Sequence, residues 1–243
     1  MTTAAPVAGV TPAPKSLPAR FVGILFSPKD TFQSVVAAPK VLGMLAITAV
    51  LVGFFAALPM TTDAGKQAAI ENQVQQMKSL GFTVSDQMYD QMEKGASRMP
   101  YTTAIGALVA TPIMSLIFAG ILFAIFNAAL GGEASFKQVF AVYIHGGPIS
   151  VVSTALSGVV NYFTGHVGSV ANLGALLPML SEKSFVANLL GAVDIFIVWS
   201  IVVLAIGLGV LYKRRTQPIA ISLLSVYAVI AIVIALLKSR GGA

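Results

Sequence analysis

Two titratable side chains, Asp194 and His145, fall within the long apolar segments of this sequence. A carboxylate at the centre of a bilayer costs roughly 2.5–3.5 kcal/mol on insertion scales, so we expect Asp194 to meet a partner or an aqueous cavity. If a helix begins near Phe185, Asp194 lies about two to three turns inside it. If the helix begins at Ile195, Asp194 is an interfacial N-cap. The apolar character of residues 185–193 favours the buried position.

His145 precedes the break Gly146-Gly147-Pro148, where proline removes a backbone hydrogen bond and predicts a kink. At helical rise His145 lies roughly 10 Å deep, which would allow it to pair with Asp194. A histidine bonded to a carbonyl freed by the kink is an equally good alternative. Trp199 completes the candidate polar site, although its five-residue spacing from Asp194 points it elsewhere on a helix.

Neither residue belongs to a catalytic motif. The sequence has no His-Glu-x-x-His pattern, no Gly-x-Ser-x-Gly elbow and no phosphate loop, and it has no cysteine. Glu133 and Lys137 are four residues apart, which predicts an ion pair on the first turn of a helix rather than a catalytic pair. We therefore expect no enzymatic activity, no metal site and no cofactor.

The composition requires lipid as a solvent. Hydrophobic residues make up 56% of the 243 residues and charged residues only 10%, and the mean hydropathy is +0.86. A soluble domain carries about 25% charged residues. The net charge of +6 is spread over loops and termini, so we expect membrane flanks rather than nucleic-acid binding.

The apolar runs predict an all-α, polytopic transmembrane helix bundle. We expect five spans, with six as the alternative, at 41–62, 101–130, 139–163, 185–212 and 217–237. The remaining segments are predicted as a disordered tail (1–19), an interfacial amphipathic helix (20–40), an external helical hairpin (63–100), an external or re-entrant loop (164–184) and a C-terminal tail (238–243).

The amphipathic segment before the first span contains a helix-start pattern. Ser27 is the expected N-cap, Pro28 the first-turn residue and Asp30 the acidic reach-back partner. Phe32 and Val35 then form an apolar face that we expect to lie on the membrane surface. Packing against the cytoplasmic end of the bundle is the alternative.

The flanking charges predict the orientation. Lys213-Arg214-Arg215 fill a tight turn, whereas the hairpin of residues 63–100 carries four basic and five acidic residues. The positive-inside rule then places the N-terminus in the cytoplasm and the C-terminus outside, in the cell inner (cytoplasmic) membrane.

Three segments resemble the prokaryotic branch of the Yip family, polytopic proteins named for their interaction with Ypt/Rab GTPases in eukaryotes. They are Ser27-Pro28-Lys29-Asp30-Thr31-Phe32, the turn from Gly131 to Phe140, and Asp194-Ile195-Phe196-x-x-Trp199. The resemblance covers roughly residues 20–237 and implies five helices and a cytoplasmic N-terminus. The eukaryotic Asp-Leu-Tyr-Gly-Pro motif is absent and the N-terminal region is short, so Rab binding is not implied.

The resemblance and the residues together favour a non-catalytic membrane scaffold or adaptor. A small transporter, channel or lipid-handling protein that uses Asp194 and His145 is the alternative, and a polar cavity reaching Asp194 would favour it. We expect membrane lipids as partners, and the sequence also allows protein partners or self-association through glycine and alanine faces. Gly207 and Gly209, with Ala205, predict a smooth face for close helix packing.

Overall fold

The computed structural model describes residues 15–79, 81–175 and 184–240, and the elements within them are helical, as the sequence predicts. In chain order they are α1 (Leu17–Phe26), α2 (Pro28–Ala37), α3 (Leu42–Ala57), the 3-10 turn η1 (Pro59–Thr61), α4 (Asp63–Ser79), α5 (Asp86–Gly95), the 3-10 turn η2 (Ala96–Arg98), α6 (Met99–Phe123), the π-helical turn η3 (Ala124–Ala129), α7 (Phe136–His145), α8 (Gly147–Thr164), α9 (Phe185–Ala192), α10 (Ile195–Leu211) and α11 (Thr216–Arg240).

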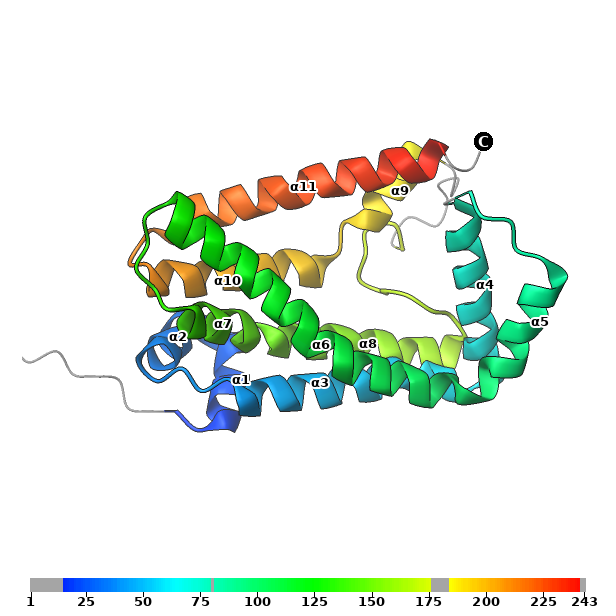
Figure 1. Ribbon diagram of the computed structural model, residues 1–243, viewed down its shortest axis with the longest axis horizontal. Coiled ribbons are helices and arrows are strands. Elements are labelled where there is room, and N and C mark those ends of the chain that lie inside the picture. The colour runs from blue at the N-terminus through cyan, green and yellow to red at the C-terminus, as the bar shows by residue number, and fades with distance from the viewer. Residues whose placement is uncertain (1–14, 80, 176–183, 241–243) are drawn as a thin grey trace, which may run out of the picture.

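The helices form an elongated bundle with two different ends (Figure 1). Helices α3, α8, α10 and α11 run along the long axis, and α6 crosses them diagonally. One end, here called the basic end, holds α1, α2 and the turn between α10 and α11. The other end, here called the hairpin end, holds α4 and α5, and α11 finishes on the same side. The predicted helical hairpin of residues 63–100 is therefore α4 and α5 followed by the start of α6.

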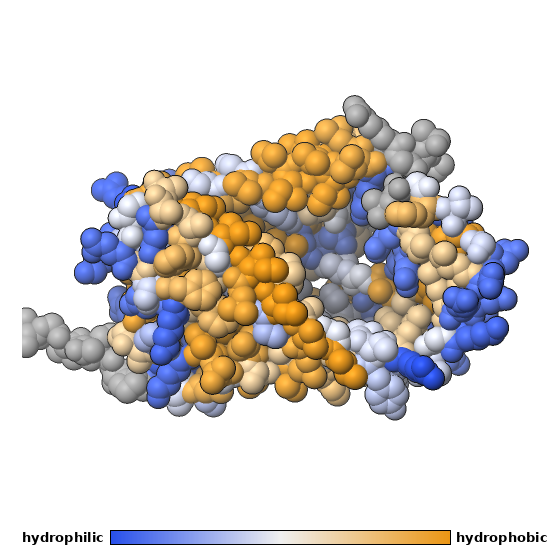
Figure 2. Space-filling model, viewed as in Figure 1, coloured by the Kyte–Doolittle hydropathy of each residue, from blue (hydrophilic) through white to orange (hydrophobic). Residues whose placement is uncertain are grey.

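Among the residues that the structure describes, three helical segments are long and apolar enough to cross a membrane: Asp86–Ala129, Phe136–Thr164 and Thr216–Ser239. Two further predicted spans correspond to shorter apolar helices, α3 and α10. Only 17% of the most apolar stretches of the first and last segments is buried within the protein. Figure 2 shows this exposed apolar surface in orange along α6 and α11. Since every backbone group of a helix is satisfied internally, such faces suit contact with lipid.

Helices α1 and α2 pack against the bundle through the face that was predicted to enter the membrane surface. Phe32 and Val35 are fully buried in the main core, together with Val142 of α7 and Leu208 of α10. The prediction of one interfacial helix across 20–40 is wrong in this respect, because α1 and α2 are separate helices with Ser27 between them. The face of Phe32 and Val35 follows the alternative prediction, in which it packs against the end of the bundle.

Glycine makes this packing close. A Cβ atom added to Gly207 of α10 would lie 2.7 Å from Cγ1 of Val142 and 2.9 Å from Cε1 of Phe32. No side chain fits at that distance, so the small-residue face predicted from Gly207 and Ala205 lies inside the bundle, where Ala205 is fully buried. Neighbouring helices pack closely at this face, as the sequence predicts.

The cap of α2 differs in detail from the prediction. Ser27 is the N-cap residue and Pro28 begins the helix, with Asp30 in its first turn. The Ser27 side chain makes no capping bond. The backbone carbonyl of Ser27 instead accepts from the Thr31 hydroxyl at 3.0 Å. At the other boundary, α1 begins at Leu17, three residues earlier than the predicted start of the amphipathic helix at residue 20; residues 1–14 lie outside the described part of the chain.

The predicted ion pair between Glu133 and Lys137 is wrong. Glu133 precedes the first turn of α7, and Lys66–Asp63 is the only ion pair among the described residues. A capping box starts α7 instead: the Ser135 hydroxyl accepts from the Gln138 N–H, and Gln138 Oε1 accepts from the Ser135 N–H at 2.9 Å. The spacing Ser-x-x-Gln is a known helix-start signal, so this sequence pattern was the informative one.

Candidate functional site

The predicted helix of residues 185–212 is interrupted beside Asp194. Helix α9 ends at Ala192 and α10 begins at Ile195, while Val193 and Asp194 are extended. Asp194 is the N-cap of α10, and its Oδ1 accepts from the backbone N–H of Phe196 at 2.7 Å and of Ile197 at 3.2 Å. A single helix starting near Phe185 is therefore wrong. Asp194 is nevertheless buried, with 6% of its surface exposed.

The loop after α8 returns to pair with this break. Leu173 donates its N–H to the carbonyl of Val193 at 2.9 Å, and Ile195 donates to the carbonyl of Ala171 at 3.2 Å. Asn172 and Asp194 thus form an isolated antiparallel β-bridge. An unpaired backbone group in an apolar surrounding is costly, so this loop supplies the partners that a continuous helix would have provided. Residues 176–183 of the predicted external or re-entrant loop lie outside the described residues.

A tyrosine of α11 satisfies two further backbone groups at the break. The hydroxyl of Tyr227 accepts from the Asp194 N–H at 3.1 Å and donates to the carbonyl of Ala192 at 2.8 Å. Sequence reasoning missed this residue. The available signal was a single tyrosine within the uncharged segment 217–237, because a buried tyrosine usually finds a hydrogen-bond partner.

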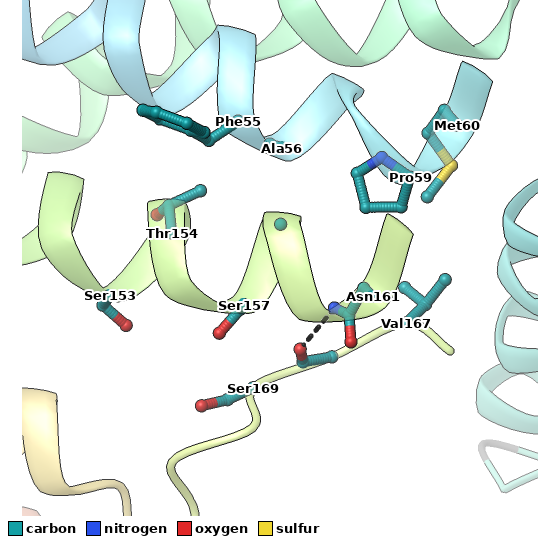
Figure 3. Close-up of a pocket in the computed structure, with 12 residues that line it drawn as sticks. Phe55, Ala56, Pro59, Met60, Ser153, Thr154, Ser157, Asn161, Val167 and Ser169 are labelled. Carbon is teal, nitrogen blue, oxygen red and sulfur yellow. Dashed lines mark hydrogen bonds between the residues drawn. The ribbon is translucent and has the colours of Figure 1, made fainter. Parts of the chain in front are cut away.

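The second carboxylate oxygen of Asp194 connects the break to a cavity. The hydroxyl of Ser169 donates to Oδ2 of Asp194. Ser169 also lines a cavity of about 290 Å³ that Figure 3 shows between α3 with η1, α8 and the following loop. Its lining residues are Phe55, Ala56, Pro59, Met60, Ser153, Thr154, Ser157, Gly158, Asn161, Val167, Gly168 and Ser169.

Hydroxyl and amide groups give the cavity a polar side. In Figure 3 the hydroxyls of Ser153 and Ser157 point away from α3, toward the side where Ser169 lies. The buried Asn161 donates its side-chain N–H to the carbonyl of Gly168 at 2.8 Å, which holds the loop against α8. Ser157 accepts from the N–H of Val170 at 3.4 Å. The cavity can therefore hold small polar groups, and its lining contains no charged side chain.

His145 does not join Asp194. Its Nδ1 lies 2.7 Å from the carbonyl oxygen of Ala141, one turn earlier in α7, and the ring is fully buried. The Asp194 carboxylate accepts from Phe196, Ile197 and Ser169, so the predicted pair is absent. The alternative, in which His145 bonds to a backbone carbonyl, is the arrangement that the structure has. The carbonyl belongs to Ala141, however, and is not one that Pro148 leaves free.

His145 belongs to a separate buried polar region near the basic end. Its Nε2, Oγ1 of Thr48 and Nε of Arg20 are buried without a hydrogen-bond partner among the described residues. Arg20 donates to the carbonyls of Ala38 at 3.2 Å and Ser34 at 3.4 Å, and burial lowers the pKa of its guanidinium. The helix is interrupted where the kink at Gly146-Gly147-Pro148 is predicted, with α7 ending at His145 and α8 beginning at Gly147.

Trp199 does not take part in the polar site, and the described residues there form no metal site. Trp199 packs at the edge of the main core beside Phe196, with ring centroids 6.1 Å apart. Within residues 15–79, 81–175 and 184–240, no group of three His, Cys, Asp or Glu side chains could hold a metal ion. The arrangement is thus a capped, broken helix beside a small polar cavity.

Comparison with known proteins relates this chain to a family of membrane proteins. Residues 22–237 match the family model described as the Yip1 domain. The chain is 26% identical over 225 residues to the membrane protein YknW of Bacillus subtilis (strain 168), an alignment that covers 91% of this chain and 92% of that relative. No solved structure matches the chain.

Proposed function

The chain belongs to the Yip1 domain family of membrane proteins, and from this we propose that it is a non-catalytic scaffold or adaptor within the membrane. The observation that carries the proposal is the bonding of Asp194. One oxygen of its carboxylate caps α10 and the other accepts from Ser169. A carboxylate engaged on both oxygens by its own fold stabilises a helix start and favours a structural role.

The charge distribution supports a five-span topology for this proposal. The spans would be α3, α6, α7 with α8, α9 with α10, and α11. The basic end carries eight basic and two acidic residues: Lys15, Arg20, Lys29, Lys40, Lys137, Lys213, Arg214, Arg215, Asp30 and Glu133. The α4–α5 hairpin is less basic, so we place the N-terminus in the cytoplasm and the C-terminus outside the inner membrane.

We place the contact with a protein partner on α6. Gly106 and Ala110 are exposed and four residues apart on this helix. A Cβ atom added at Gly106 would meet no other atom within 4 Å, so the backbone of a partner helix could approach closely there. Lipids would contact the remaining apolar surface of α6 and α11.

The test combines two substitutions with a crosslinker. A photo-crosslinking amino acid at Ala110 is expected to give discrete protein adducts in cells that produce the full chain. Asn is as good an N-cap as Asp, so Asp194→Asn should keep these adducts. Asp194→Leu removes the cap and should weaken them together with the fold. Lipid adducts alone in the unsubstituted chain would contradict the scaffold proposal.

A specific observation favours a second candidate, a small transporter or lipid-handling protein. The cavity of about 290 Å³ reaches Asp194 through Ser169, and α10 begins at a break within an apolar segment. Discontinuous helices of this kind surround substrate sites in transporters. Proton or cation flux into vesicles that contain the purified chain tests this candidate. Flux that Asp194→Asn abolishes, with the fold intact, would favour transport over the scaffold.

A further inference from the structure

A second, larger cavity opens near the basic end, between η3, which follows α6, and the start of α11. Its volume is about 570 Å³, within the range of roughly 300–1,000 Å³ that is usual for ligand pockets. Seven of its lining residues are apolar and three are polar: Ile125, Phe126, Leu130, Pro218, Ile219, Leu223 and Val226, then Arg214, Arg215 and Ser222. We call it the η3–α11 groove.

The packing of the helices leaves this groove unfilled. Helix α6 packs mainly on α3 and α7, whereas α11 packs mainly on α10 and α9. The buried side of the groove is fixed: Phe126 stacks on Tyr212 with ring centroids 5.0 Å apart, and the Tyr212 hydroxyl donates to Oδ1 of Asn127 at 2.7 Å. The lining residues Ile125, Leu130 and Val226 remain exposed. The groove therefore has a rigid wall and an open apolar side.

Two guanidinium groups stand at the groove. Arg214 and Arg215 are both exposed, and Arg214 uses one N–H group to donate to the carbonyl of Leu130 at 3.2 Å. Lys66–Asp63 is the only ion pair in the part of the chain that the structure describes, so neither arginine is neutralised by a carboxylate there. Guanidinium groups match phosphate oxygens in geometry and charge.

We propose that the η3–α11 groove binds one anionic glycerophospholipid of the surrounding bilayer. An acyl chain lies along Phe126, Ile219 and Val226, and the phosphate contacts Arg214 and Arg215. A lipid fits both features at once, because the basic turn lies where a span meets the head groups. A second copy of the chain would bring its own basic end, which carries only two acidic residues, against these arginines. The site is independent of the scaffold and transport candidates.

Quenching by brominated lipids in vesicles tests the site directly. Trp199 is the only tryptophan, so a Trp199→Phe background allows a new tryptophan to report on one position. Val226→Trp places it in the groove, and Val229→Trp places it on α11 outside the groove; these valines are 58% and 60% exposed. The full chain is reconstituted with phosphatidylcholine and phosphatidylglycerol, either of which carries bromine on its acyl chains.

At Val226→Trp we expect the relative binding constant obtained from quenching to favour phosphatidylglycerol over phosphatidylcholine by about five- to twenty-five-fold. Each arginine near the surface contributes about a factor of five to this preference. At Val229→Trp the preference should be near one. Arg214→Gln with Arg215→Gln should abolish the preference. Lys29→Gln with Lys40→Gln removes the same charge from the same end and should leave the preference unchanged.

Four outcomes would overturn the proposal. Equal preference at both tryptophan positions, or equal loss in both double variants, would mean general surface attraction. Absence of quenching at Val226→Trp, with normal quenching at Val229→Trp, would mean that protein covers the groove. Because a tryptophan could itself fill the groove, native mass spectrometry of the unsubstituted chain provides a second measurement. One retained phosphatidylglycerol, lost in the double arginine variant, supports the site; no retained lipid contradicts it.

Discussion

The hydroxyl of Tyr227 on α11 binds the backbone N–H of Asp194 at 3.1 Å and also donates to the carbonyl of Ala192 at 2.8 Å. One phenol thus satisfies a donor and an acceptor on the two sides of the α9–α10 break. The break and the last helix are thereby joined by hydrogen bonds in a region where few water molecules can replace them. This bridge makes α11 part of the site that holds Asp194.

Tyr227→Phe should destabilise the protein while it leaves helix content nearly unchanged. The substitution removes both hydrogen bonds and leaves two backbone groups unpaired, which costs about 1–3 kcal/mol for a buried group. Thermal unfolding of the purified protein in detergent measures the change. Tyr101→Phe is the matched control, because Tyr101 is 72% exposed at the start of α6. Equal unfolding temperatures for both variants would contradict the bridging role.

Gly132→Ala is expected to destabilise the loop between η3 and α7. A Cβ atom at Gly132 would lie 2.5 Å from Cε1 of Tyr212 and 2.7 Å from the carbonyl oxygen of Phe126. Overpacking of this kind costs about 1–3 kcal/mol. Gly120→Ala is the control, since the same added atom meets nothing within 4 Å in α6. In unfolding experiments Gly120→Ala should be neutral or stabilising, and an equal loss in both variants would be evidence against a specific clash.

The helical bundle was predicted correctly from the sequence, whereas the break at Asp194 was not. Uncharged runs such as 217–237 specify a helix through their apolar character alone, and the structure has α11 there. Residues 185–193 are also uncharged and mainly apolar, so a continuous helix was favoured over a helix that begins at Ile195 with Asp194 as its N-cap. The partners that stabilise it come from Leu173 and from Tyr227, which is 33 residues away from Asp194 along the chain. Such long-range pairing cannot be obtained from helical periodicity.

The start of α7 shows the opposite case. Ser135 and Gln138 have capping-box spacing and form the box, whereas Glu133 and Lys137 were preferred because opposite charges four residues apart also fit a helix. The helix boundary decides between the two patterns, and a boundary is the least certain feature of a sequence-based prediction. His145 was placed correctly at a helix break, but its partner depended on backbone geometry.

Helix α1, and not α2, should make the membrane contact at the basic end. Val22 and Phe26 lie four residues apart and are 54% and 81% exposed, whereas Ile24 is fully buried. The chain has no cysteine, so single-cysteine spin labels can be introduced without a background change. In vesicles, labels at Val22 and Phe26 should be accessible to oxygen dissolved in lipid, and a label at Phe32 should be accessible to neither oxygen nor a polar reagent. Lipid exposure at every position would contradict this arrangement.

The five-span topology predicts opposite sides for the two ends of the bundle. Helix α11 starts at the basic end and finishes at the hairpin end (Figure 1), so an insertion after Arg215 should be cytoplasmic and an insertion after Lys94 external. The physical reason is the positive-inside rule, which acts most strongly on short loops such as Lys213-Arg214-Arg215. A reporter that is active only in the cytoplasm, inserted into the otherwise full chain, measures this directly.

We expect reporter activity for the insertion after Arg215 and none for the insertion after Lys94. An insertion after Glu133 should behave like the one after Arg215, because the loop between η3 and α7 lies at the same end. Activity at Lys94, or its absence at Arg215, would exclude the five-span topology with a cytoplasmic N-terminus.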